Sequence, residues 1–500
     1  MTPVQHTQQQ LLRTKFLARG TRGNFINGQE CEPHSGKYLP VVDPASELQV
    51  CLAPDSDATD VHAAVVSARQ AFDDSIWSRM RPAERERLLY QLSLLIEQHG
   101  AELSALETLQ SGKLQAIAQA VDVQGGAECV RYMAGWATKL EGQTLQPSIV
   151  GAAGAQFHTW TRREPLGVVA AVVPWNFSLA IALWKVAPAL ATGCTVVLKP
   201  APETPLTALR LAELALQAGF PPGVLNVVCG GAHTGAALVG HAGINKISFT
   251  GSTATGQAIG QLALAHLTRT TLELGGKSPL IVLEDADVQQ AAFGAAMGIF
   301  FNQGQVCTAG SRVYVQRRHF DAVTHEMARI AESLKIGSGF DPQVQLGPVV
   351  SERHFERVMG HLEGARQQGA TVLTGGGRSG SAGYFVQPTV LVNTAPDMRV
   401  VQEEVFGPVV VAVPFDTVDE VVQLANASPF GLAASIWSNN LAQVHRLIPR
   451  LQAGTVWVNC HNLLDNNLPL GGYKQSGVGK DLGRAAVESY TELKSVCMAV

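Results

Sequence analysis

The stretch Gly167-Val168-Val169-Ala170-Ala171-Val172-Val173 decides the fold of this chain. It is a continuous apolar run, which is typical of a strand buried on both faces of a parallel sheet. A helical segment from Ser178 to Leu190 follows it, with Ser178 as the expected N-cap. Further strand patterns come at residues 194–198, 224–228 and 246–250, with helical segments between them. This alternation predicts an α/β fold with a doubly wound parallel sheet.

The carboxyl ends of these strands are the expected binding edge, because ligands of doubly wound sheets bind there. They carry Pro174-Trp175-Asn176, Lys199-Pro200 and Gly251-Ser252. A second α/β unit follows from about Ser278. The tail, residues 489–500, alternates enough to predict an exposed strand, which invites pairing with a partner subunit.

Composition excludes several classes of protein. A chain of 500 residues is too long for one ordinary core, so we expect two or three domains. The net charge is −4 and there is no stripe of Lys and Arg, which argues against nucleic acid as a partner. The most apolar region, residues 167–198, is interrupted by Pro174, Asn176, Lys185 and Pro188, so no membrane span is expected. The eight cysteines form no CxxC pair and the Gln-rich N-terminus has no apolar signal segment, so we expect a cytoplasmic protein with reduced thiols.

One cysteine and one carboxylate stand out by their surroundings. The segment Phe301-Asn302-Gln303-Gly304-Gln305-Val306-Cys307-Thr308 places Cys307 in a polar turn, and Thr271-Leu272-Glu273-Leu274-Gly275-Gly276-Lys277 places Glu273 in an apolar strand that ends in glycine. A thiolate can attack an aldehyde, and a carboxylate in apolar surroundings can have a raised pKa that suits a base near neutral pH. Asn176, after the first strand, can donate to an oxyanion. From the residues alone, an inert cysteine, a surface glutamate and a turn-forming asparagine remain open readings.

Two apparent nucleotide motifs and a metal site are not supported. Gly375-Gly376-Gly377-Arg378-Ser379-Gly380 matches GxGxxG, but an extended pattern follows where a helix should begin, so we predict a surface loop. Gly276-Lys277-Ser278 resembles the end of a P-loop, yet Thr271 stands where the first glycine of that loop is required. The His and Cys residues do not fall at ligand spacings, so no metal is expected.

Six segments occur in the order of a known family. They are Pro174-Trp175-Asn176-Phe177, Phe249-Thr250-Gly251-Ser252-Thr253, Leu272-Glu273-Leu274-Gly275-Gly276-Lys277, Gln303-Gly304-Gln305-Val306-Cys307, Glu403-Glu404-Val405-Phe406-Gly407-Pro408 and Leu470-Gly471-Gly472-Tyr473-Lys474-Gln475-Ser476-Gly477. Cys307 follows Glu273 by 34 residues, which is the family's spacing. The chain therefore resembles the NAD(P)-dependent aldehyde dehydrogenase superfamily over nearly its whole length. Residues 303–307, Trp457-Val458-Asn459 and the loop 463–469 look most like bacterial phenylacetaldehyde dehydrogenases.

The resemblance implies three structural parts. The NAD-binding domain would comprise residues 1–141 and 165–275, and the catalytic domain residues 276–480. Residues 142–164 and 481–500 would form a small β oligomerisation flap. It also implies a homo-oligomer, either a tetramer or a dimer. The implied substrate is a small aldehyde.

The resemblance assigns roles to the residues of the site. Cys307 would be the nucleophile, forming a thiohemiacetal and then a thioester, and Glu273 the base for thioester hydrolysis. Asn176 would be an oxyanion donor, and Lys185 would help to relay protons. For the cofactor, NAD, the implied residues are Pro174, Trp175, Lys199, Gly251, Ser252, Gly275, Glu404 and Phe406.

One position departs from the family pattern. NAD-preferring relatives usually carry a glutamate three residues after the lysine at Lys199, where this chain has Pro202 followed by Glu203. A missing ribose clamp would leave less repulsion toward a 2′-phosphate, whereas Glu203 could restore it. NAD is the expected cofactor and NADP the alternative.

The implied substrate tunnel is almost wholly apolar. Its residues by family position are Phe177, Ile181, Trp184, Val306, Thr308, Leu463, Leu464 and Leu470. No Arg lies between His461 and Leu470, so a carboxylated aldehyde lacks an obvious anchor. An aromatic or medium aliphatic aldehyde fits, with phenylacetaldehyde first. The alternatives are another aldehyde (aliphatic or amino), a cofactor-independent esterase, or a non-catalytic protein on this scaffold.

Overall fold

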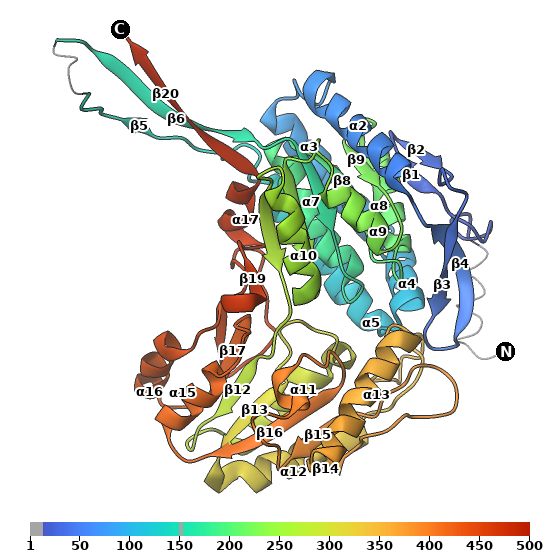
Figure 1. Ribbon diagram of the computed structural model, residues 1–500, viewed down its shortest axis with the longest axis vertical. Helices are drawn as coiled ribbons and strands as arrows, with labels where there is room; N and C mark the ends of the chain where they lie inside the picture. The colour runs from blue at the N-terminus through green and yellow to red at the C-terminus, as the bar shows by residue number, and fades with distance from the viewer. Residues whose placement is uncertain (1–13, 150–153) are drawn as a thin grey trace.

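The computed structural model describes residues 14–149 and 154–500. It has two lobes and a long arm that projects from one of them, away from the other lobe (Figure 1). One lobe is built on an eight-stranded sheet of order β19-β11-β10-β7-β8-β9-β1-β2. Its strands are β1 (Asn24–Ile26), β2 (Gln29–Cys31), β7 (Val168–Val172), β8 (Thr195–Lys199), β9 (Leu225–Val227), β10 (Lys246–Thr250), β11 (Arg269–Glu273) and β19 (Gly477–Val478).

The strands β11, β10, β7, β8 and β9 run parallel, so the predicted doubly wound sheet is confirmed. All five residues of β7 are buried. Val169 and Ala171 pack into one apolar cluster, while Val168, Ala170 and Val172 pack into another on the opposite face. This two-sided burial explains why the deciding stretch is apolar without alternation.

Helices cover both faces of this sheet. One face carries α2 (Ala58–Asp74), α9 (Ala232–Val239) and α10 (Thr253–Leu264). The other carries α3 (Pro82–Gln98), α4 (Gly100–Ser111), α6 (Gly126–Ala134), α7 (Ser178–Thr192), α8 (Leu206–Ala218) and α17 (Gly483–Ser489), with the short α5 (Gln115–Ile117) and the π-helix η1 (Ala118–Gly125) beside them. A separate pair of strands, β3 (Tyr38–Asp43) and β4 (Leu48–Pro54), lies at the edge of the lobe.

The second lobe is a seven-stranded sheet of order β14-β15-β16-β13-β12-β17-β18. Its strands are β12 (Pro279–Val282), β13 (Arg312–Gln316), β14 (Thr371–Thr374), β15 (Thr389–Val392), β16 (Val409–Phe415), β17 (Ala433–Trp437) and β18 (Thr455–Val458), all parallel except β14. Its helices are α11 (Val288–Phe300), α12 (Phe320–Ser333), α13 (Glu352–Gln367), α14 (Arg399–Gln402), α15 (Val418–Asn426) and α16 (Leu441–Leu447), with the short turns η2 (Phe301–Gly304), η3 (Arg317–His319), η4 (Ile448–Arg450) and η5 (Lys474–Ser476). The second α/β unit predicted from residue 278 is therefore present.

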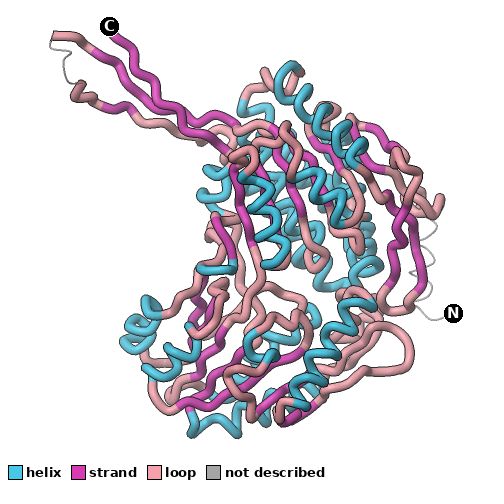
Figure 2. The backbone as a smooth tube through the Cα atoms, in the orientation of Figure 1, coloured by secondary structure: helices cyan, strands magenta, loops and turns pink. Residues whose placement is uncertain are grey.

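The arm is a three-stranded antiparallel sheet of β5 (Thr144–Leu145), β6 (Phe157–Pro165) and β20 (Thr491–Ala499). Figure 2 shows its strands extending well beyond the helices. The predicted C-terminal strand is confirmed, and it pairs with β6 along all nine of its residues. β20 is also an outer strand of this sheet, so one of its edges is unpaired among the residues that the structure describes.

Two local expectations have definite outcomes. Residues 375–380 follow β14 without opening a helix, so the surface loop predicted there is confirmed. Ser178 is not the N-cap of α7: it is the first helical residue, and its hydroxyl donates to Glu107 Oε2 at 2.9 Å. A local pattern could not reveal this partner, which lies 71 residues upstream.

We propose the domain boundaries given above. Two contacts join the later parts to the first lobe: Gly477–Val478 of the proposed catalytic domain pairs with β11, and α17 of the proposed oligomerisation segment packs against α7. None of the helices within the described ranges is long and apolar enough to cross a membrane. The Gln-rich segment for which no signal sequence was predicted lies outside the described residues.

Candidate active site

Residues 301–308, the cysteine turn, leave α11 and reverse direction sharply. Asn302 and Gln303 adopt positive φ angles of 48° and 58°, which non-glycine residues rarely adopt. Asn176 Nδ2 donates to the carbonyl of Gln305 at 3.0 Å, and Asn302 Nδ2 donates to the carbonyl of Asn176 at 3.2 Å. The segment after β7 and the cysteine turn are therefore tied together by two amide hydrogen bonds.

Cys307 is half-buried, and its surroundings oppose ionisation. Burial raises the pKa of the thiol to about 12, and the negative charges of Glu404 and Glu273 add to the effect. The N–H groups of Thr308 and of Cys307 itself act in the opposite direction by hydrogen bonding to the sulfur. The thiol of the protein alone is therefore protonated at neutral pH. A Cβ at Gly276, three residues after Glu273, would lie 2.3 Å from the carbonyl oxygen of Cys307, so the segment that follows Glu273 lies against the cysteine turn.

Glu273 is the last residue of β11, and its side chain is buried. Its Oε1 has no hydrogen-bond partner among the described residues. Burial raises the pKa of this carboxyl well above its usual value; the charge of Asp481 raises it further, while Lys185 and Lys480 lower it. A Cβ at Gly471 would lie 2.5 Å from Oε1, so the carboxyl needs a glycine there. An unpartnered carboxyl with a raised pKa suits a general base.

Lys185 is fully buried on α7 and belongs to a polar network that the sequence did not predict. Its Nζ donates to Asp481 Oδ2 at 2.9 Å and to Ser248 Oγ at 3.3 Å, and the hydroxyl of Tyr490 donates to Ser248 Oγ at 3.0 Å. Asp481 also influences Glu273, so Lys185 and Glu273 share this acidic neighbour. Asp481 lies beyond the last matching segment and has no motif of its own, so only the fold could identify it.

Two predicted cofactor positions lie at the same edge of the first sheet. Lys199 ends β8 and is buried, and burial lowers the pKa of its ammonium to about 8. Gly251 and Ser252 follow β10, and Ser252 caps α10 by accepting from the N–H of Thr255 at 3.3 Å. β8 and β10 flank β7, so a buried cation and a helix N-terminus lie at neighbouring strand ends.

The other predicted cofactor residues form a cradle next to the cysteine turn. Glu404 Oε1 accepts from the N–H of Gly276 at 3.0 Å, and burial raises the pKa of this carboxyl to about 7. A Cβ at Gly275 would lie 2.4 Å from Glu404 Oε2, so the backbone and the carboxyl leave no room for a side chain. The ring of Phe406 meets that of Trp175, which follows Pro174, edge to face at 5.2 Å.

These residues fit a nicotinamide dinucleotide. The buried ammonium of Lys199 suits a ribose hydroxyl, and the start of α10 suits a pyrophosphate. Thr250 Oγ1, beside it, is buried without a partner in the described part of the chain. No group of three His, Cys, Asp or Glu side chains that could hold a metal occurs in residues 14–149 and 154–500.

The position of Glu203 bears on the departure at Pro202. Glu203 Oε1 accepts from Arg353 Nη2 at 3.2 Å, which links the first lobe to α13. Its negative charge also raises the pKa of Lys199 against the larger lowering by burial. A carboxylate thus lies near the predicted ribose position, from the residue next to the family's usual one.

The predicted tunnel residues divide into a buried group and an exposed group. Phe177, Ile181, Val306 and Leu470 belong to one apolar cluster with Trp184 packed against it, and Thr308 is buried nearby. The loop residues Leu463 and Leu464 are 63% and 45% exposed. Two residues that contact predicted tunnel residues were not predicted: Asn462, whose Oδ1 accepts from Thr308 Oγ1 at 2.7 Å, and Phe301, whose ring stacks with that of Phe177 at 6.4 Å.

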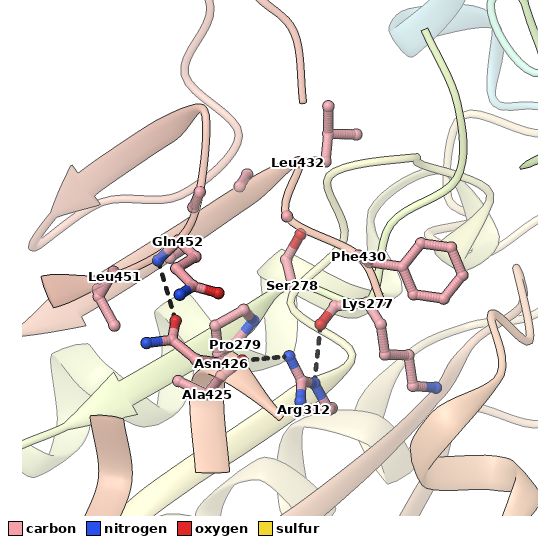
Figure 3. Close-up of a pocket in the computed structure, with 14 residues that line it drawn as sticks. Lys277, Ser278, Pro279, Arg312, Ala425, Asn426, Phe430, Leu432, Leu451 and Gln452 are labelled. Carbon is pink, nitrogen blue, oxygen red and sulfur yellow. Dashed lines mark hydrogen bonds between the residues drawn. The ribbon is translucent and has the colours of Figure 1, made fainter. Parts of the chain in front are cut away.

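A small cavity lies behind the strands of the second lobe and is lined by Lys277, Ser278, Arg312 and Asn426 among others (Figure 3). Arg312 Nε donates to the carbonyl of Lys277 at 2.8 Å, and Nη2 donates to the carbonyl of Ala425 at 2.9 Å. None of the predicted catalytic side chains lines this cavity. The hydrogen bonds of Arg312 fix the backbone that follows Gly276, so this cavity has a structural role and is not the reaction site.

Comparison with known proteins decides the family. The sequence pattern of the aldehyde dehydrogenase family matches residues 31–496. The chain belongs to this family. It is 51% identical to the phenylacetaldehyde dehydrogenase of Pseudomonas fluorescens over 478 residues, which is 95% of each chain.

Solved structures confirm the fold of this aldehyde dehydrogenase. The NAD+ complex of the enzyme from Bacillus cereus superposes with a TM-score of 0.94 at 44% identity, covering 100% of this chain and 99% of that chain. The indole-3-acetaldehyde dehydrogenase of P. syringae, in complex with NAD+ and IAA, superposes with a TM-score of 0.95 at 38% identity and 100% coverage of both chains.

Proposed function

We propose that this aldehyde dehydrogenase oxidises an apolar aldehyde, with phenylacetaldehyde as the first candidate, to its carboxylic acid with NAD. The observation that carries this proposal is the arrangement of three side chains, those of Cys307, Asn176 and Glu273. The Cys307 thiol lies in a turn held by the Asn176 amide, the negative charge of Glu273 raises the pKa of that thiol, and Oε1 of Glu273 has no hydrogen-bond partner among the described residues. A nucleophile, an oxyanion donor and a base are the parts that this chemistry needs.

The first step joins the substrate to the enzyme. Cys307 Sγ attacks the aldehyde carbon, and Glu273 accepts the thiol proton as the C–S bond forms. Asn176 Nδ2 carries two N–H groups, of which one is bonded to Gln305, so the second is available for the oxyanion. The backbone N–H of Cys307 supplies the other donor.

The second step oxidises and releases the product. When bound, NAD supplies the hydride acceptor that turns the thiohemiacetal into a thioester. Glu273 first releases the thiol proton to solvent and then takes a proton from the water that attacks the thioester. Passing this proton to the departing Cys307 thiolate releases the acid and restores the thiol. Lys185, held by Asp481, stabilises the negative charge around Glu273 between these proton transfers.

The apolar tunnel supports the substrate class. The ring of Phe177, a predicted tunnel residue, stacks with that of Phe301, and this pair would offer an aromatic wall to a substrate ring. Two of the three relatives named above are named for phenylacetaldehyde and indole-3-acetaldehyde, and each of these compounds carries an aryl group on an acetaldehyde. Other aldehydes, aliphatic or amino, are the alternative outcome of a substrate panel.

We also propose NAD over NADP, because the negative charge of Glu203, which raises the pKa of Lys199, would disfavour a 2′-phosphate bound at that lysine. The unpaired edge of β20 supports a homo-oligomer, a tetramer or a dimer. The free cysteines of the described chain support a reducing, cytoplasmic location.

The test mixes the purified protein with NAD or NADP and a panel of aldehydes and follows NADH absorbance. Phenylacetaldehyde with NAD should give the highest kcat/KM, and Cys307→Ala should abolish turnover while calorimetry still detects NAD binding. A preference for NADP would refute the cofactor assignment. Ester cleavage with no NADH from any aldehyde would instead indicate a hydrolase.

A further inference from the structure

Three ionisable side chains form a fully buried group beside the candidate active site. Glu107 lies on α4, Lys113 follows the end of that helix, and Asp122 lies on the π-helix η1. Their exposed fractions are 0%, 1% and 0%. Lys113 Nζ contacts Asp122 Oδ2 at 2.6 Å and Glu107 Oε2 at 3.8 Å. We call these three residues the ion cluster.

Stability alone is a weak reason for such a cluster. Taking charges out of water is costly, and apolar side chains of similar volume often leave a protein equally stable. The two carboxyls outnumber the single ammonium. Burial raises the pKa of Asp122 to about 7, opposed by the charge of Lys113 and increased by that of Glu107. The other hydrogen bonds of the cluster therefore indicate what it does.

Three of those bonds lie at the start of α7, and a fourth comes from α8, where Thr207 Oγ1 donates to Glu107 Oε1 at 2.7 Å. Glu107 accepts from Ser178 Oγ at 2.9 Å and from the N–H of Leu179 at 2.9 Å, and Asp122 Oδ1 accepts from the N–H of Ala180 at 3.4 Å. The residue before α7 supplies no side-chain cap. Two carboxyls from elsewhere in the chain therefore satisfy the N–H groups that a helix start leaves free, at its positive end.

The two residues before α7 are the ones the site depends on. Lys113 Nζ lies 4.5 Å from the ring centroid of Phe177, a cation–π contact. The same ring stacks with Phe301, the first residue of the cysteine turn. Asn176 bonds to Gln305 within that turn. Phe177 therefore contacts both the ion cluster and the cysteine turn, and Asn176, the residue before it, is bonded to the cysteine turn.

We propose that the ion cluster positions Asn176 and Phe177 and thereby sets both the rate of attack by Cys307 and the preference for aromatic aldehydes. This inference rests on the proposed function of these three residues. The carboxyls fix where α7 begins, and so where the Asn176 amide points. Lys113 holds one face of the Phe177 ring, which fixes the wall that the substrate meets. The cluster residues do not contact the substrate and are positioning residues.

The test uses Glu107→Gln and the neutral pair Lys113→Met/Asp122→Asn, with Asp122→Asn alone as the mildest change. At temperatures well below melting, kcat/KM for phenylacetaldehyde should fall about tenfold, because small displacements of reacting groups are costly in rate. The preference for phenylacetaldehyde over hexanal should fall about threefold, within the limits for one apolar contact. Cofactor-free hydrolysis of p-nitrophenyl acetate should slow as much as kcat/KM, since it needs the same oxyanion donor.

Coupling separates positioning from stability. In an Asn176→Ala background, Glu107→Gln should cause no further loss of ester hydrolysis, because the group that it positions is gone. Arg22→Met is the matched control: it removes a buried cation that is paired with Glu30 and with Glu213 of α8, and it should lower the melting temperature without changing kcat/KM or the preference.

Two results would overturn the inference. One is a set of cluster variants that melt earlier but keep the wild-type kcat/KM, preference and ester hydrolysis. The other is a loss that adds fully to that of Asn176→Ala. Failure of the wild type to oxidise any aldehyde would refute the proposed function instead, and ester hydrolysis would still decide the role of the ion cluster.

Discussion

A single methyl group at Gly276 should disable the enzyme by pressing on the cysteine turn. An ideal Cβ there lies 2.3 Å from the carbonyl oxygen of Cys307, whereas real Cβ contacts essentially never fall under 3.0 Å. The obstacle is the backbone of Cys307, so in Gly276→Ala either the cysteine turn or the segment that carries residue 276 must move by about 0.7 Å. A misplacement of 1 Å can cost about 100-fold in rate, so we expect a loss of roughly 30-fold in kcat/KM. That corresponds to about 2 kcal/mol in the barrier, and overpacking should cost about 1–3 kcal/mol of stability.

The assay is steady-state NADH formation with phenylacetaldehyde, together with the melting temperature of each variant. Gly360→Ala is the matched control, because no atom lies within 4 Å of a Cβ at that position on α13. It should keep the wild-type kcat/KM and gain up to about 1 kcal/mol from the better helix propensity of alanine. A Gly276→Ala enzyme within about threefold of wild type would refute the reasoning, because the site would then tolerate a shift that is held to be costly.

Three further predictions concern the base. Glu273→Gln should lower kcat by about 10²- to 10⁴-fold. Its melting temperature should rise above that of wild type as the pH increases past 4.5, because the folded wild-type carboxyl keeps a proton that the unfolded chain loses. Calorimetric melting temperatures of the two proteins that change in parallel with pH would contradict this prediction. The kcat/KM of the wild type should rise with pH through neutrality, because Glu273 has a raised pKa and must be ionised before it can accept the Cys307 proton. A decline between pH 6 and about 8 would contradict this prediction. Gly471→Ala should displace the Glu273 carboxyl and thereby slow thioester hydrolysis. The expected sign is a larger pre-steady-state burst of NADH than in wild type. An unchanged burst would show that the new Cβ does not displace Glu273.

Much of the fold could be predicted because its signals are local. An unbroken apolar run can be buried on both faces of a sheet, as β7 is, and a glycine after a helical segment marks its end, as Gly219 does with a φ of 99°. Cys307, Glu273 and Asn176 could also be named, because each lies in a segment of distinctive residues. The cap of α7 could not, since Ser178 has the right chemistry for a cap but bonds to Glu107 instead.

The sequence by itself determined the alternation of strands and helices, the edge of the sheet where the site lies, and the residue types that can act there. Only the tertiary structure decided their environment. The pKa of Cys307 and of Glu273 depends on burial and on charges contributed by Glu404 and Asp481, which are far away in the chain. Desolvation and electrostatic interaction depend on distance in space, and a linear pattern does not contain those distances.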